Sequence, residues 1–470
     1  MARSMTRDLT EGKPMRLVLS FAAPLLFGML FQQFYSFVDT AIVGRYLGAE
    51  KLAAVGATGS VNFLVLGLCL GFCSGFSIPI AQAFGAKNEH EVRRSVWHAA
   101  VLSAVLSLVF GLAATLGCKP LLRLMNTPEE ILDSSAAYIR IIFAAIPCTV
   151  LYNMAGGILR SLGDSKTPVV FLILASLVNI VLDLFLIIVC GMDVAGAAVA
   201  TAVSQLIAGV GCLAVIIRRF PILKLTKADR KFSLKRGRSM LGIGLPMGLQ
   251  FSITAIGSVM VQWSVNGLGV NAVAAISAAV KLSMFFACVF DALASTMATF
   301  AGQNTGARKL DRVGEGLVAA ARIGIVYCAL AFGVVMLFGD RLLGLFIDGG
   351  QNAEVMALGF QYLKINASMY IPLLFVNILR LCIQGMGFTR VAMFAGLSEM
   401  LARTAVALWV VPVAGFTGAC LANPAAWIMA DLFLFPCYFR LMRSLRCRLM
   451  PDTEAPEAEK GKIIRIRESA

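Results

Sequence analysis

An acidic side chain inside the first long apolar run is the feature of this sequence most able to do chemistry. The stretch Phe31 to Gly48, FQQFYSFVDTAIVGRYLG, ends an apolar run that begins near Leu17, and it places Asp39 within that run. A carboxylate costs ~2.5–3.5 kcal/mol to insert into hydrocarbon, so acids at such depths usually face a cavity and bind an ion or a proton. The alternative is that Asp39 lies at the headgroup level and only ends the helix.

A second acid belongs to the motif NIVLD, which runs from Asn179 to Asp183. Four-residue spacing places the amide of Asn179 and the carboxylate of Asp183 on one face of a helix. At ~1.5 Å of rise per residue, both lie in the outer half of the first lobe, at the depth of Asp39, Tyr138 and Thr201. Taken singly, Asn179 and Thr201 are also what ordinary interhelical hydrogen bonding would use.

Carboxylate, amide and hydroxyl oxygens are the ligands that hard cations prefer. We therefore predict one cation-coupling site at Asp39, Asn179, Asp183 and Thr201, with Tyr138 close by, which would hold Na⁺ or a proton. A proton is the second option because a desolvated or paired carboxylate holds a proton more readily than one in water. Three neighbouring side chains, Gln33, Phe34 and Tyr35, are predicted to line the substrate cleft.

The acids of the second half of the chain are predicted to form structural contacts rather than an ion site. Glu399 and Arg403 lie four residues apart, so we expect them to neutralise each other on one helix. Lys281 and Asp291 share another apolar run and are expected to be structural partners of a neighbouring helix. Tyr362 occupies the position that corresponds to Tyr138 and has no obvious acid beside it.

The composition places these residues in a polytopic membrane protein. Of 470 residues, 59% are hydrophobic and 14% are charged, and the mean hydropathy is +0.82. The net charge of +15 comes from connecting loops, which indicates membrane orientation rather than nucleic-acid binding. The twelve cysteines form no CxxC pair and there are two histidines, so we expect no disulfide framework, no transition-metal centre and no cofactor. No nucleophile–base pair occurs in the apolar runs, and no enzyme is predicted.

Apolar runs of about 20 residues predict an all-α protein with twelve transmembrane helices. These cover residues 17–42, 54–83, 95–117, 135–158, 168–190, 195–217, 239–266, 273–300, 317–338, 359–384, 391–412 and 417–439. Basic residues gather in alternate loops, above all between Arg218 and Arg238, whereas Glu129, Glu130 and Asp340 lie on the opposite side. The positive-inside rule then places both termini in the cytoplasm of a bacterial inner membrane.

The two halves of the chain resemble each other. Gln82-x-x-Gly85-Ala86 matches Gln303-x-x-Gly306-Ala307, and Tyr138 pairs with Tyr362, at offsets between 221 and 224. An even number of spans per repeat makes the copies parallel, with a central cleft that rocking opens to either side. We predict an N-lobe over 1–217, a cytoplasmic basic linker over 218–238, a C-lobe over 239–441 and a disordered cytoplasmic tail over 442–470.

The sequence resembles the multidrug and toxic compound extrusion (MATE) family over about residues 10–440. The resemblance is carried by VDTAIVGRYLG around Asp39, AQAFGAKN with its copy AGQNTGARK, RSLGDSKTP, and NIVLD followed by VAGAAVAT. It implies a two-lobe antiporter that exports organic cations in exchange for Na⁺ or H⁺. In the DinF-like and archaeal-type branch, the ion site would fall on the N-lobe residues named above. The branch that uses acids of the seventh and tenth helices is not matched, because those spans offer only Gln250, Gln262, Asn266, Asn377 and Gln384.

The predicted function is antiport of amphipathic, often cationic, drugs or metabolites against Na⁺ or H⁺ by a monomer in contact with membrane lipids. A lipid-linked precursor flippase of the same superfamily is the alternative, since Lys281 and Arg403 could hold a pyrophosphate. A passive channel is a further alternative, although the duplicated lobes and the lack of a charged ring at a constriction argue against it.

Overall fold

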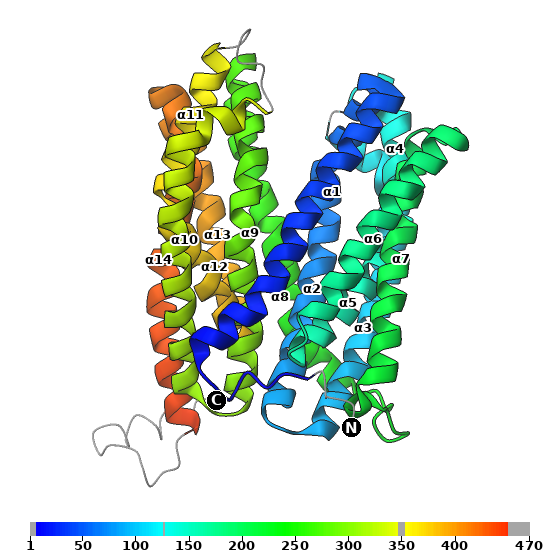
Figure 1. The fold of residues 1–470 in the computed structure, drawn as a ribbon, viewed down its shortest axis with the longest axis vertical. Coiled ribbons are helices and arrows are strands. Elements are labelled where there is room, and N and C mark those ends of the chain that lie inside the picture. Colours follow the sequence, from blue (N-terminus) through cyan, green and yellow to red (C-terminus); the bar gives the residue numbers. More distant parts are fainter. Residues whose placement is uncertain (1–5, 126, 346–352, 450–470) are drawn as a thin grey trace.

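The computed structural model describes residues 6–125, 127–345 and 353–449, and these fold into helices joined by turns and short loops. The helices form two bundles that lie side by side, touch near the end where the described residues begin and end, and diverge toward the opposite end (Figure 1). The helices are α1 (Pro14–Ala57), α2 (Gly59–Gly85), α3 (Glu89–Leu124), α4 (Glu129–Ala144), α5 (Ile146–Ser161), α6 (Lys166–Leu184), η1 (Phe185–Val189), α7 (Asp193–Arg219), η2 (Pro221–Leu223), α8 (Leu234–Asn266), α9 (Val270–Gly306), α10 (Leu310–Leu343), α11 (Ala353–Ser368), α12 (Tyr370–Gly385), α13 (Thr389–Ala405), η3 (Val406–Val410) and α14 (Val411–Leu449).

The described helices agree with the predicted all-α membrane fold. Nine of them are long and apolar enough to cross a membrane, and two bent pairs raise the number to eleven among the described residues. One of the nine, Thr389–Arg448, has 60 residues, which at ~1.5 Å per residue is far longer than the ~30 Å hydrocarbon core. This segment is broken at Gly415, where φ is 57°. Counting its two parts as separate spans raises the number from eleven to the twelve that the sequence predicts.

Two spans that the sequence predicts as continuous, 135–158 and 359–384, are broken. The axes of α4 and α5 differ by 44°, and those of α11 and α12 differ by 53°. Pro147 and Pro372 follow the two breaks. A proline lacks an N–H and clashes with the preceding turn, but it is tolerated in the first turn of a new helix. The two breaks occupy equivalent places in the two repeats.

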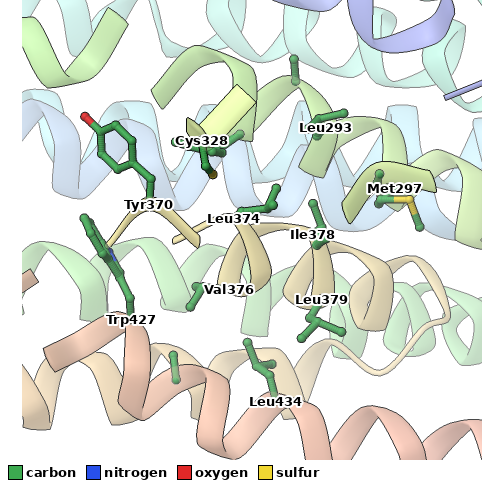
Figure 2. Packing of buried hydrophobic residues seen from close by; sticks show 14 of the residues in the cluster. Leu293, Met297, Cys328, Tyr370, Leu374, Val376, Ile378, Leu379, Trp427 and Leu434 are labelled. Carbon is green, nitrogen blue, oxygen red and sulfur yellow. The ribbon is translucent and has the colours of Figure 1, made fainter. Parts of the chain in front are cut away.

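The first helix does not belong to one bundle alone. In Figure 1 α1 slants from the base of the bundle formed by α9–α14 to the far end of the bundle formed by α2–α7. Its first turns bury Leu17, Val18 and Phe21 in the core of the α9–α14 bundle. Figure 2 shows the inner part of that core, where Leu374 and Ile378 of α12 lie between Leu293 of α9 and Leu434 of α14. We use N-lobe for α2–α7 with the second half of α1, and C-lobe for α9–α14 with α8.

Glycines allow the lobes to approach closely along α2 and α8. A Cβ on Gly71 would lie 2.4 Å from the Cα of Gly248, and one on Gly75 would lie 2.5 Å from the Cα of Gly244. The glycines are four residues apart on each helix, the small-residue spacing that packs membrane helices backbone to backbone. These helices form the seam between the lobes.

The repeated Gln-x-x-Gly-Ala motifs close this seam at the end near the termini. The side-chain amide of Gln82 donates to the carbonyl of Gly385 over 3.1 Å, and that of Gln303 donates to the carbonyl of Ser161 over 2.9 Å. Each bond joins one lobe to the other, and the two are related by the internal repeat. We call these two crossing bonds the inner seam.

Residues 7–12 lie across the inner seam. Arg7 N–H donates to the carbonyl of Leu162 in the N-lobe, and Leu9 N–H donates to the side-chain oxygen of Gln303 in the C-lobe. Lys309 also donates to the carbonyl of Thr10. The segment before α1 therefore ties both lobes together at this end.

The predicted linker is mostly ordered structure. Within it, the Asp229 carboxylate accepts from the Thr226 N–H and hydroxyl and pairs with Arg93 over 3.1 Å. These hydrogen bonds and the Arg93 charge lower the pKa of Asp229 to about 2, so the loop is held against α3. The helix α14 runs to Leu449, so the tail predicted from 442 begins later, and residues 450–470 lie outside the described part of the chain.

Candidate cation-coupling site

Four helices of the N-lobe bring the predicted site residues together. Asp39 lies on α1, Tyr138 on α4, Asn179 and Asp183 on α6, and Thr201 on α7. The helix α6 changes into the π-helix η1 two residues after Asp183. Such π-helical turns occur mostly as local interruptions of α-helices, often at functional sites. Here the change lies next to the acid.

The two acids form the centre of this cluster. The carboxyl groups of Asp39 and Asp183 are close enough to interact directly, and Tyr138 lies near both of them. The amide of Asn179 donates to the hydroxyl of Thr201 over 3.4 Å. Asp183 is 0% and Asn179 1% exposed, whereas Asp39 is half-buried. The common depth inferred from the sequence thus corresponds to a real cluster of side chains.

The cluster holds more oxygen atoms than it can satisfy internally. Oδ1 of Asp39, Oδ1 of Asn179 and both carboxylate oxygens of Asp183 are buried without a hydrogen-bond partner in the described part of the protein. Each such buried acceptor costs on the order of 1–3 kcal/mol, and more when charged. A bound hard cation or a shared proton would satisfy them, and this donor set fits either.

The three predicted cleft residues do not share one environment. Phe34 is 61% exposed and packs edge-on against Phe285 of the C-lobe at 5.5 Å between ring centroids. Gln33 lies beside Cys288 of α9. Tyr35 instead reaches Thr201 and adjoins both acids, so the structure places it with the cation cluster.

Glu399, a buried acid of the C-lobe, is held by two arginines. Glu399 pairs with Arg403 over 3.6 Å, as the spacing predicts, and also with Arg380 of α12, which the sequence reasoning missed. Lys281 and Asp291, which we expect to be structural partners of a neighbouring helix, are both exposed and form no ion pair within the described ranges. The only signal for Arg380 was its charge inside an apolar run.

Arg403 contributes a positive charge to the C-lobe cluster that corresponds to the N-lobe site. Its Nε donates to Asn423 over 3.3 Å, and the Asn423 amide donates to the hydroxyl of Tyr362 over 3.0 Å. Tyr362 and Asn423 are the repeat equivalents of Tyr138 and Thr201, at offsets of 224 and 222. The corresponding C-lobe cluster therefore carries its own positive charge.

Comparison with known proteins gives the same family for both halves of the chain. The MatE family model matches residues 24–185 and again residues 246–409. The "Probable multidrug resistance protein YpnP" of Bacillus subtilis is 30% identical over 374 residues, which cover 79% of this chain and 82% of that protein. The "FAD transporter" of Shewanella oneidensis is 25% identical over 362 residues, which cover 76% and 79% of the two chains.

A solved structure has the same fold. The "Outward-facing conformation of a multidrug resistance MATE family transporter of the MOP superfamily" superposes with a TM-score of 0.88 at 22% identity, covering 95% of this chain and 99% of that one. Two matches to one family model, together spanning most of the chain, establish the family as well as the internal duplication. The chain belongs to the multidrug and toxic compound extrusion (MATE) family of membrane transporters.

Proposed function

We propose that this MATE transporter is a secondary antiporter that exports amphipathic, often cationic, organic molecules in exchange for Na⁺ or H⁺. The observation that carries the proposal is the group of four unsatisfied oxygen atoms on Asp39, Asn179 and Asp183. A coupling ion that enters from outside would satisfy these oxygens. The same ion would then compete with a bound cationic substrate and drive its release.

The exchange requires two alternating states. The divergence of the lobes away from the termini (Figure 1) and the inner seam at the other end fit an outward-open state. We propose that both termini are cytoplasmic, that the chain acts as a monomer in a bacterial inner membrane, and that it belongs to the DinF-like branch. The branch proposal is supported by acids in the N-lobe cluster and arginines in the C-lobe cluster.

The flippase alternative depends on two basic residues, Lys281 and Arg403, and one of them already has partners within the protein. Arg403, 7% exposed, is engaged by Glu399 and Asn423 inside the C-lobe, so it is not available to a pyrophosphate in the cleft. The channel alternative predicts flux without a coupling gradient, and the efflux assay described next separates it from antiport.

The test is ethidium efflux from proteoliposomes with sodium and pH gradients imposed separately. One of the two gradients should drive efflux in the wild type. Asp39→Asn keeps the volume of the side chain but removes its charge, so energised efflux should fall at least tenfold while insertion and elution remain normal. Asp133→Asn is the matched control, because that acid lies in the N-lobe with a side chain 87% exposed. Normal efflux by Asp39→Asn would mean that Asp39 only ends its helix and takes no part in ion coupling.

A further inference from the structure

A cavity with a single basic side chain lies between the lobes, just above the inner seam. Its volume is about 70 Å³, enough for a small polar group, and α2 and α5 of the N-lobe line it together with α8, α9 and α12 of the C-lobe. Arg160, Ser74, Ser295 and Thr299 are among its polar lining residues. It is separate from the Asp39–Asp183 cluster, whose residues do not line it.

Arg160 has no counterion. Throughout the described chain, no carboxylate pairs with its guanidinium and no hydrogen bond engages it. The nearest acid along the chain is Asp164, but its oxygens accept from the N–H groups of Lys166 and Thr167 and from the Thr167 hydroxyl. Asp164 therefore caps α6 instead of neutralising Arg160. A half-buried guanidinium without a partner is costly, and a bound anion would remove that cost.

Two hydroxyl groups complete the donor set from opposite lobes. Ser74 lies on α2 and Ser295 on α9, at the repeat offset of 221, and both face the cavity. Neither hydroxyl has a hydrogen-bond partner among residues that the structure describes. By contrast, the Ser77 hydroxyl of the same cavity already donates to the carbonyl of Cys73. Ser74 and Ser295 can therefore donate to a ligand that lies between the lobes.

The basic group is present in one repeat only. The repeat equivalent of Arg160 is Gln384, at an offset of 224, and its amide donates to Gln250 over 2.6 Å. A purely structural arginine at this symmetric seam would be expected in both copies. The cavity instead presents one guanidinium and two free hydroxyls, which are the donors that bind phosphate and carboxylate groups.

We propose that this cavity binds an oxyanion group, phosphate or carboxylate, of the exported molecule through Arg160, Ser74 and Ser295. The proposal rests on the export function above and narrows its substrates to amphipaths that carry an anionic group, alone or beside a cationic one. Because the two serines belong to different lobes, the bound oxyanion bridges them. Rocking the lobes apart at this level would separate its donors and release it.

Two flavins that share one ring system and differ by a phosphate test the assignment. Purified full-length protein is titrated with riboflavin 5′-phosphate and with riboflavin, and binding is followed by flavin fluorescence. Arg160→Gln should weaken riboflavin 5′-phosphate binding at least tenfold and leave riboflavin binding unchanged. Arg160→Lys keeps the charge, so it should weaken riboflavin 5′-phosphate binding less than Arg160→Gln does. Arg341→Gln, an exposed arginine of α10, is the matched control and should bind both flavins normally.

Folding is controlled by a second variant and by stability. Ser295→Ala removes one hydroxyl and should weaken only riboflavin 5′-phosphate binding, by a few fold. Without ligand, Arg160→Gln should melt at or above the wild-type temperature, because an unpaired cation has been removed. Equal weakening for both flavins, or undiminished binding of the phosphorylated one by Arg160→Gln, would refute the oxyanion site.

Competition identifies the source of the anion. Displacement of riboflavin 5′-phosphate by inorganic phosphate supports a site for soluble oxyanions. Displacement only by phosphatidylglycerol would overturn the assignment to an exported molecule in favour of a lipid headgroup. If Arg160→Gln leaves flavin binding unchanged while efflux still depends on Asp39, the oxyanion site is refuted and the antiport proposal stands. Loss of gradient-driven efflux in the wild type, with Arg160-dependent binding intact, would refute only the antiport.

Discussion

At the scale of single residues, the two lobes neutralise their deep acids in different ways. Asp39 and Asp183 have no basic partner in the described structure, and several of their oxygens are unsatisfied. Glu399 is enclosed by Arg380 and Arg403. In the proposed function the N-lobe cluster takes a cation from solution, whereas the C-lobe cluster already contains the charges of two arginines. This difference explains why duplicated helices can serve unequal roles.

Removal of the C-lobe carboxylate should destabilise the protein. Glu399→Gln would leave the buried Arg403 without a carboxylate partner and Arg380 with Asp431 alone, and breaking a buried pair in this way costs about 3–5 kcal/mol. We expect a large fall in the thermal midpoint, measured in detergent. Glu354→Gln, on an exposed turn of α11, should change the midpoint little. Equal midpoints for the two variants would mean that the arginines are satisfied without Glu399.

The sequence predicted part of this residue-scale picture. Asn179 and Asp183 were found because helical spacing places them on one face, and Asp39 because an acid in hydrocarbon is costly. Arg160 and Arg380 were missed as site residues, because a basic residue near the end of an apolar run also fits a headgroup position. Only the packing of several helices shows that both arginines lie inside.

At the scale of elements, the inner seam is built from the most recognisable repeated motif. A Cβ on Gly306 would lie 1.9 Å from the carbonyl oxygen of Gln82, and a Cβ on Gly85 would lie 1.9 Å from that of Gln303. The glycines allow α2 and α9 to meet backbone to backbone, and the glutamines then bond across. In the proposed alternating access, both elements must separate when the transporter opens inward.

A methyl group at the seam should favour the inward-open state. Gly306→Ala forces α2 and α9 apart at this end, so a cysteine at the buried position Thr299 should react faster with a thiol reagent in inside-out vesicles. A tenfold increase would correspond to about 1.4 kcal/mol between the two states. Gly333→Ala is the control, because its Cβ meets open space. An unchanged rate would show that the seam is not what keeps this end closed.

The sequence did not predict the breaks in two of the spans, because the apolar pattern continues through them. The spans 135–158 and 359–384 remain apolar through their bends, so hydropathy shows no break. The prolines at 147 and 372 were the available signal. The π-helices η1 and η3 carry no such signal, because five apolar residues fit an α-helix equally well.

At the scale of the whole molecule, the proposed orientation predicts which surfaces face outside. Cys190 is exposed and lies between α6 and α7 at the end away from the termini. A membrane-impermeant thiol reagent should label it in intact cells, and Cys190→Ser should abolish that labelling. Lys227→Cys in the Cys190→Ser background should be shielded until the cells are opened. Labelling of Lys227→Cys from outside would reverse the orientation and the assigned depth of the cation cluster.

The most direct test of the shared cation site is the stability that its ion confers on the folded protein. An ion that binds only the folded state stabilises it by about 2.7 kcal/mol at 100 times its dissociation constant. Thermal midpoints are therefore compared in sodium against choline at fixed pH, and across pH without sodium. The thermal midpoint of the wild type should change either with sodium or with pH. Residues of one network are non-additive, so Asp39→Asn and Asp183→Asn should each abolish the response, and the double variant should behave like either single one. Independent, additive losses from the two aspartates would contradict a single shared site.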